Sequence, residues 1–116
     1  MATVTHTPTT VRIAFGPFER LFTGRATHTI PVEAIREASA IPDAVGHLRG
    51  ARRGLEVTGL VKVGVWGVFG RRRTLAAAYR GVPGLRLVLD GDEFAEVVVS
   101  HAGAGELAAA LGRVAS

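Results

Sequence analysis

Apolar and polar side chains alternate along several short segments of the chain, and a period of two is typical of β-strands with one buried face. The alternation predicts a first strand at residues 11–15, and extended segments follow at residues 27–30 and 35–41. Four further strands are predicted at residues 60–69, 74–79, 85–89 and 94–99. Because short turns and no helices separate these four, the pattern indicates an antiparallel sheet rather than βαβ units.

Turn signals support this division. Asp90-Gly91 is a strong hairpin signal between the last two strands, and residues 81–84 predict another turn. Gly64, Gly67 and Gly70 recur every three residues, a spacing that fits neither a dinucleotide fingerprint nor a phosphate-binding loop. We interpret them as bends at the corner of a barrel, with a bulge or close backbone packing as the alternatives.

Helical periodicity follows the first strand for a few residues. Pro17 suits the first position of a helix, and Phe18, Leu21 and Phe22 have the spacing i, i+3, i+4 before Gly24. One helical turn is therefore predicted at residues 17–24. The segment is short enough for a β-hairpin to be the alternative.

The C-terminal segment changes to the helical period over a longer stretch. Residues 106–114 are mostly helix formers and place Leu107, Leu111 and Val114 on one apolar stripe. An isolated amphipathic helix must bury such a stripe, and the sheet is the surface large enough to receive it. We therefore predict a helix that caps the sheet.

Length and composition indicate one domain. The chain has 116 residues, of which 47% are hydrophobic and 21% charged, so one core can form and disorder is not expected. Residues 1–9 are rich in threonine and are assigned to a flexible tail, and residues 10–116 to a single domain. Few apolar anchors interrupt the glycines of residues 43–54, which predict a long loop; whether residues 43–56 form a lid, a short helix or a plain loop stays open.

The predicted fold is mainly β, within the α+β class: a small antiparallel β-barrel or roll capped by one C-terminal α-helix. The chain has no cysteine, which removes disulfides and thiolate chemistry. Its start lacks the pattern of a signal peptide, and no apolar run approaches the ~20 residues of a membrane span. We therefore expect a cytoplasmic protein.

Several short motifs follow one another in a distinctive order. The front half carries Val11-Arg-Ile-Ala-Phe-Gly-Pro-Phe-Glu-Arg-Leu and Thr29-Ile-Pro-Val-Glu-Ala-Ile-Arg-Glu-Ala, and the back half carries Val65-Trp-Gly-Val-Phe-Gly-Arg-Arg-Arg, Ala78-Tyr-Arg-Gly, Val88-Leu-Asp-Gly and Val97-Val-Val-Ser. Over residues 10–115 this order resembles that of small actinobacterial proteins with a pleckstrin-homology-like (PH-like) domain. The resemblance implies a PH-like barrel that serves as a binding scaffold, which in eukaryotic relatives often binds phosphoinositide head groups.

Basic residues gather in one part of the chain. Residues 49–86 hold nine basic residues against the single acid Glu56, whereas the remainder holds five basic and nine acidic residues. This asymmetry predicts a segment that attracts anions, although a solvated hairpin surface also explains it. The phosphoinositide site of PH-like relatives would correspond to residues 16–20, which contain Glu19 and no basic cluster, so no lipid-binding residues are carried over.

Arginine side chains supply the candidate site, because a guanidinium can bind phosphate or carboxylate with two parallel hydrogen bonds. The candidate anion-binding residues are Arg71, Arg72, Arg73, Arg80 and Arg86. Trp66 and Phe69 could stack a nucleic-acid base, but residues three apart in a strand face opposite sides of the sheet. Only one of the two aromatic rings can therefore join the arginines.

Motifs for catalysis or metal binding are not found in the sequence. The histidines His6, His28, His47 and His101 lack metal-ligand spacing, and no serine lies in a nucleophile elbow. The acids Asp90, Asp92 and Glu93 lie at a hairpin turn, which is usually solvated, so they are assigned to turn formation. We expect no catalytic residue, metal or cofactor, and we rank a small-ligand enzyme last.

The sequence therefore favours a non-catalytic binding or interaction module, with protein contacts ahead of other ligands. A protein partner or a second copy could pair with a sheet edge. The alternative is an electrostatic binder of an anionic ligand, a nucleic acid or a membrane surface through the hairpin at residues 71–73. Lipid and nucleic acid have the weaker support, and no transmembrane segment is predicted.

Overall fold

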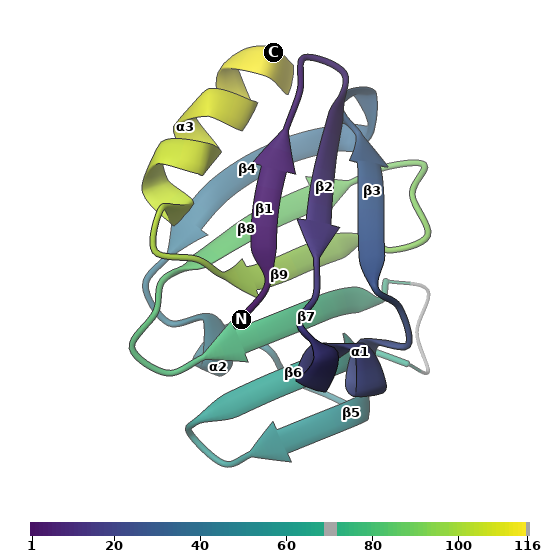
Figure 1. The fold of residues 1–116 in the computed structure, drawn as a ribbon, viewed down its shortest axis with the longest axis vertical. Coiled ribbons are helices and arrows are strands. Elements are labelled where there is room, and N and C mark those ends of the chain that lie inside the picture. The colour runs from purple at the N-terminus through teal and green to yellow at the C-terminus, as the bar shows by residue number, and fades with distance from the viewer. Residues whose placement is uncertain (69–71, 116) are drawn as a thin grey trace.

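The computed structural model describes residues 1–68 and 72–115, and arranges them as two β-sheets with helices around them (Figure 1). The smaller sheet is antiparallel, with strand order β1-β2-β3: β1 (Thr3–His6), β2 (Thr10–Ala14) and β3 (Thr27–Pro31). The larger sheet has the strand order β4-β8-β9-β7-β6-β5: β4 (Ile35–Ile41), β5 (Arg52–Val57), β6 (Val61–Trp66), β7 (Thr74–Tyr79), β8 (Gly84–Leu89) and β9 (Glu96–Ser100). The helices are α1 (Pro17–Thr23), α2 (Ala44–His47) and α3 (Ala104–Ala115), and a 3-10 turn at Val32–Ala34 leads into β4.

The main core lies between the two sheets, where the smaller sheet and α3 cover one face of the larger sheet (Figure 1). Side chains alternate along each strand, so every second residue reaches this core. Burial of these aliphatic side chains is the main favourable contribution to folding. The buried residues include Val11, Ile13 and Ile30 of the smaller sheet, Leu75, Leu85, Leu87 and Val97 of the larger sheet, and Leu111 of α3.

A second, smaller cluster lies on the opposite face of the larger sheet. There α2 and Leu48, the residue after it, cover strand side chains that face away from the main core. The cluster contains Ala44, Val45 and Leu48 against Trp66, Ala76, Ala78 and Val98. The central strands of the larger sheet are therefore covered on both faces.

Much of the predicted secondary structure is confirmed. Strands are present at residues 10–14, 27–31, 35–41, 61–66, 74–79, 84–89 and 96–100, and the mainly β chain ends in a helix. The segment after β2 is the helix α1 and not the alternative hairpin. Pro17 begins the helix, and Gly24 ends it in the left-handed conformation with φ 75°. Leu107 and Leu111 of the predicted stripe pack on the main core; the side chain of Val114 lies outside the described ones.

The first residues form a strand where the sequence predicts a flexible tail. β1 pairs with β2 from Thr3↔Ala14 to His6↔Val11. Ala2 and Val4 are buried in the main core. Two apolar side chains among threonines are a weak sequence signal, but backbone pairing with β2 holds the segment in place.

The predicted antiparallel order of the last four strands is wrong at one point, because β9 lies between β7 and β8. β9 is antiparallel to β8 but parallel to β7, with Leu75 opposite Val97. Val97, Val98 and Val99 are fully buried. Such a strand needs cover on both faces, and a central place in the sheet supplies it.

The two sheets do not close into the predicted barrel in the described part of the chain. The predicted barrel-corner role of the glycines is therefore not found at Gly64, which lies opposite Gly54 in the β5–β6 pair. A Cβ atom on Gly64 would come within 2.3 Å of the carbonyl oxygen of Arg53. The role of Gly64 is close backbone packing. Gly67 directly follows β6 and has φ 74°, and Gly70 lies outside the described residues.

Residues 43–56 form neither a lid nor a plain loop. They contain the short helix α2, whose N-terminus is capped by the Asp43 carboxylate accepting the Gly46 N–H at 2.9 Å, and most of the edge strand β5. β5 is exposed along most of its length, so it lacks the hydrophobic alternation that would predict it. Its backbone pairing with β6 makes it a strand.

Candidate functional site

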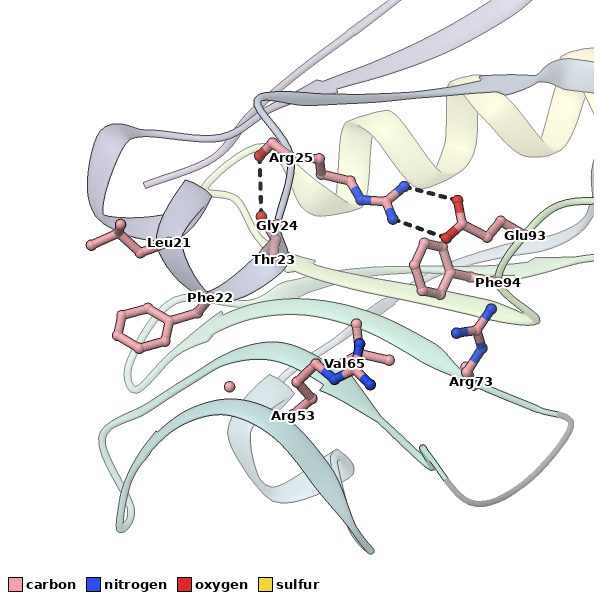
Figure 2. A pocket seen from close by; sticks show the side chains of 11 residues that line it. Leu21, Phe22, Thr23, Gly24, Arg25, Arg53, Val65, Arg73, Glu93 and Phe94 are labelled. Atoms are coloured by element: carbon pink, nitrogen blue, oxygen red, sulfur yellow. Dashed lines mark hydrogen bonds and ion pairs between the residues drawn. The ribbon is translucent and has the colours of Figure 1, made fainter.

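An open pocket of about 500 Å³ lies where α1, the β5–β6 pair and the loop between β8 and β9 meet. Figure 2 shows its side chains. The pocket is lined by Leu21, Phe22, Thr23, Gly24, Arg25, Arg53, Gly54, Val65, Arg73, Glu93 and Phe94. Its volume falls within the range of small-molecule sites, roughly 300–1,000 Å³. Three arginines and one glutamate give it a net positive charge.

Phe94 organises the cationic end of this pocket. Its ring is 1% exposed, and the guanidinium carbons of Arg25 and Arg73 lie 4.9 Å and 5.5 Å from the ring centroid. A cation over the face of an aromatic ring is attracted by the ring quadrupole. The buried ring therefore holds two arginines near each other, although they are far apart in the sequence.

Glu93 neutralises one of these arginines. Its carboxylate accepts two hydrogen bonds from Arg25, from Nη1 at 3.0 Å and from Nη2 at 2.9 Å. The hydrogen bonds from Arg25 lower the pKa of the Glu93 carboxyl below its usual value. The Arg25–Glu93 pair thus forms one rim of the pocket, as Figure 2 shows.

Arg53 and Arg73 carry the remaining positive charge. Within residues 1–68 and 72–115, no acidic side chain forms an ion pair with either of them. Arg53 lies directly opposite Val65 in the β5–β6 register, so both side chains are on the same face of the sheet. The pocket therefore has two guanidinium groups that form no ion pair with a described carboxylate, although the charge of Arg73 lies near enough to Glu93 to help lower the pKa of that acid.

A buried His28–Asp92 pair contacts Arg25 of the same rim. Nε2 of His28 lies 2.9 Å from Oδ2 of Asp92, and Nδ1 lies 3.1 Å from Nη1 of Arg25. A guanidinium can only donate, so Nδ1 accepts from Arg25 and Nε2 donates to Asp92. The Asp92 side chain is only 8% exposed, which corrects its assignment to a solvated hairpin tip.

Helix α1 is fixed to the larger sheet by a buried carboxylate. Glu19 is 1% exposed, and it accepts the Gly16 N–H at 2.9 Å and the Tyr79 hydroxyl at 2.6 Å. Burial and the bond to Glu19 raise the pKa of Tyr79 well above its usual value. This contact places Leu21 and Phe22 at the end of the pocket farther from Glu93 (Figure 2).

The predicted arginines do not form one cluster. Arg71 lies outside the described residues, Arg72 is exposed before β7, and Arg80 is exposed in the turn at the other end of β7. Arg86 lies on the face covered by α2, where it pairs with Glu96 and Glu37. Of the four described candidates, Arg73 alone lines the large pocket.

Two pocket arginines were missed by the sequence interpretation. Arg25 follows α1 as a single basic residue beside no motif, and Arg53 belongs to the edge strand that the sequence does not predict. Alternation along β5 and β6 could have placed Arg53 and Val65 on one face if the register of that pair had been known. The register depends on the Gly54–Gly64 approach, which becomes visible only in three dimensions.

A smaller cavity of about 150 Å³ lies on the opposite face, beside α2, and Arg72 contributes to it. Its acid, Glu96, accepts hydrogen bonds from His47, Thr74 and Arg86. Burial raises the pKa of Glu96, but these three bonds outweigh burial and the pKa lies below its usual value. The acid is thus already satisfied by protein groups.

Trp66 also lies on this face and is 2% exposed against α2. A ring buried in this way cannot stack a nucleic-acid base. The other half of the stacking interpretation, Phe69, lies outside the described residues. The stacking interpretation is therefore not supported at Trp66.

Among the described residues, no group of three or more histidine or acidic side chains could hold a metal ion. None of the helices in residues 1–68 and 72–115 is both long and apolar enough to cross a membrane. Comparison of the chain with protein-family models, curated proteins and solved structures found no match.

Proposed function

We propose that this chain is a non-catalytic binding module whose large pocket takes an anionic ligand. The observation that carries the proposal is the pair of arginines, Arg53 and Arg73, which line one pocket with no described acid bound to either. A carboxylate or phosphate placed between them gains charge-assisted, bidentate hydrogen bonds. The proposal keeps the anion-binding alternative from the sequence but moves it from the hairpin at residues 71–73 to the pocket.

Preorganisation supports this proposal. Phe94 holds Arg73 by a cation–π contact, and Arg25 is held by Glu93, His28 and Phe94 together. Arginines already fixed in place lose less side-chain entropy when a ligand binds, so more of the interaction energy remains as affinity.

The test is a titration of the isotope-labelled protein with inorganic phosphate and with phenyl phosphate at low ionic strength, followed by amide chemical shifts. We expect saturable shifts for residues around the pocket that weaken in high salt and are largely lost in Arg53→Ala and Arg73→Ala. Arg80→Ala is the matched control, because it removes one exposed arginine outside the pocket and should leave binding within about two-fold. Equal losses in all three variants, or no saturable shift with either probe, would refute the proposal.

A second candidate, contact with another protein molecule, is supported by the exposed side of α1. Phe18 and Leu21 are 47% and 78% exposed there, on a helix otherwise fixed by Glu19. Exposed apolar side chains that adjoin one another often mark an interaction surface. Sedimentation of the wild type and of Phe18→Ser over a range of concentrations tests self-association; a wild type that stays monomeric at high concentration removes this form of the candidate.

A further inference from the structure

We infer that the ligand of the arginine pocket is a small amphipathic anion, in which a phosphate or carboxylate group is joined to a short apolar body. This inference rests on the proposed function, because it concerns the same pocket. The inference adds that the apolar part of the pocket lining contacts the apolar body of the ligand.

The pocket is divided into two chemically different ends. Arg25, Arg73, Glu93 and Phe94 lie at one end, and Leu21 and Phe22 lie at the other, as Figure 2 shows. The lining is thus polar and charged on one side and apolar on the other. A ligand that matches both sides must itself have a charged end and an apolar end.

Val65 and Arg53 connect the two ends. Their side chains lie opposite each other on one face of the β5–β6 pair, so an apolar surface and a guanidinium are adjacent in the middle of the pocket. An anionic group bound between Arg53 and Arg73 would direct the rest of the ligand along Val65 toward Leu21. A bare inorganic anion would leave this apolar surface in water.

The apolar end is held open by the fold. Phe22 packs edge-to-face on Phe18, with ring centroids 5.3 Å apart, and the Glu19–Tyr79 bond fixes the helix that carries both rings. Leu21 is 78% exposed, so a ligand can cover it without any rearrangement of the core. Covering apolar surface on the ligand and on Leu21 and Val65 contributes about 25 cal/mol per Å² removed from water. For a phenyl group that is partly covered in an open pocket, this corresponds to roughly a ten-fold gain in affinity.

The experiment compares the dissociation constants of phenyl phosphate and inorganic phosphate for the wild type at the same low ionic strength. Phenyl phosphate should bind roughly ten-fold more tightly. Leu21→Ser and Val65→Thr should reduce this preference to about three-fold or less, since each removes apolar lining but no charge. Leu60→Ser is the matched control, because Leu60 is exposed but does not line the pocket, and it should leave the preference unchanged.

The outcomes separate the inference from the proposed function. Equal affinity for the two probes, lost in Arg73→Ala, would refute the amphipathic ligand and leave the anion site standing. No arginine-dependent binding of either probe would refute both. A stable dimer of the wild type that Leu21→Ser dissociates would also overturn the inference, because a second copy would then cover the apolar end. Val65→Thr must retain the wild-type amide spectrum; if it does not, Leu21→Ser alone decides, since Leu21 is too exposed to be needed for folding.

Discussion

Replacing Tyr79 by Phe removes one hydroxyl from the contact that joins α1 to the larger sheet. The hydroxyl donates to Glu19 at 2.6 Å, and Glu19 is 1% exposed, so solvent cannot replace the lost donor. A hydrogen bond to a charged group contributes about 1.5–3 kcal/mol, and we expect the free energy of unfolding to fall by about 2 kcal/mol. Urea denaturation at pH 7, followed by the fluorescence of Trp66, the single tryptophan of the chain, measures this loss.

A double-mutant cycle isolates the contact from other effects of the substitution. In a Glu19→Ala background the acceptor is gone, so Tyr79→Phe should cost less than about 0.5 kcal/mol. The reasoning is refuted if Tyr79→Phe costs the same in both backgrounds, or if it costs almost nothing in the wild type.

The same contact predicts a dependence on pH. Burial, followed by the hydrogen bond to Glu19 and its charge, raises the pKa of Tyr79 above the usual 10.0. A group whose pKa is raised by folding contributes stability that is complete below its unfolded pKa and is lost as pH rises toward the folded pKa. Stability should therefore fall above about pH 10 in the wild type and less steeply in Tyr79→Phe. Tyr79 is the only tyrosine, so its absorbance titrates alone: a free tyrosine is about 90% ionised at pH 11, whereas Tyr79 should stay largely protonated while the chain is folded.

Three further predictions concern the rest of the fold. Gly64→Ala should lower the free energy of unfolding by at least about 2 kcal/mol, because Gly64 has φ 144° and a Cβ there would meet the Arg53 carbonyl. Gly91→Ala should lower it by only about 1 kcal/mol, because Gly91 has φ 85° but open space around it. Equal losses of stability in thermal unfolding would contradict the close-packing role of Gly64. Leu87→Ala should lower the free energy of unfolding by about 3 kcal/mol because Leu87 is fully buried, and Leu21→Ala should lower it by less than about 0.5 kcal/mol because Leu21 is exposed. Urea unfolding that ranks the two variants in the opposite order would contradict the assigned core. Because folding lowers the pKa of Glu96 from 4.5, the ionised carboxylate stabilises the fold above about pH 4.5, and this contribution is lost as the pH falls through the pKa of the folded state. The loss of stability between pH 7 and pH 3 should therefore be smaller in Glu96→Gln than in the wild type. An unchanged loss would show that the three hydrogen bonds to Glu96 do not stabilise the fold.

Local patterns were informative about elements and much less so about partners. Alternation predicted β2 because every second residue of this strand is buried in the main core, and turn signals separated β7 and β8. Pro17 and Gly24 bounded α1 because proline and glycine act through their own backbone preferences. The same reasoning failed for β5, which is exposed on most of its length and becomes a strand through hydrogen bonds to β6. The apolar run of Val97 to Val99 indicated cover on both faces, but it did not reveal that β9 lies between β7 and β8.

The candidate site shows the same division. Arg73 was among the predicted arginines because three basic residues adjoin in the sequence. Its place in the pocket, however, depends on the cation–π contact with Phe94. Arg80 and Arg86 share its charge but lie at the other end of β7 and on the opposite face of the sheet. Arg25 and Arg53 gave no signal, since a single arginine in a basic chain is indistinguishable from a solvated surface residue.

By itself, then, the sequence determined a mainly β chain, its principal strands, a C-terminal helix and a segment rich in basic residues. These properties depend on side-chain periodicity and on the backbone preferences of single residues, which act locally. Only the tertiary structure decided the strand order, the separation into two sheets and the meeting of Arg25, Arg53 and Arg73 in one pocket. Those features depend on which faces pack together and in which register, and such choices are made by contacts between residues that are far apart along the chain.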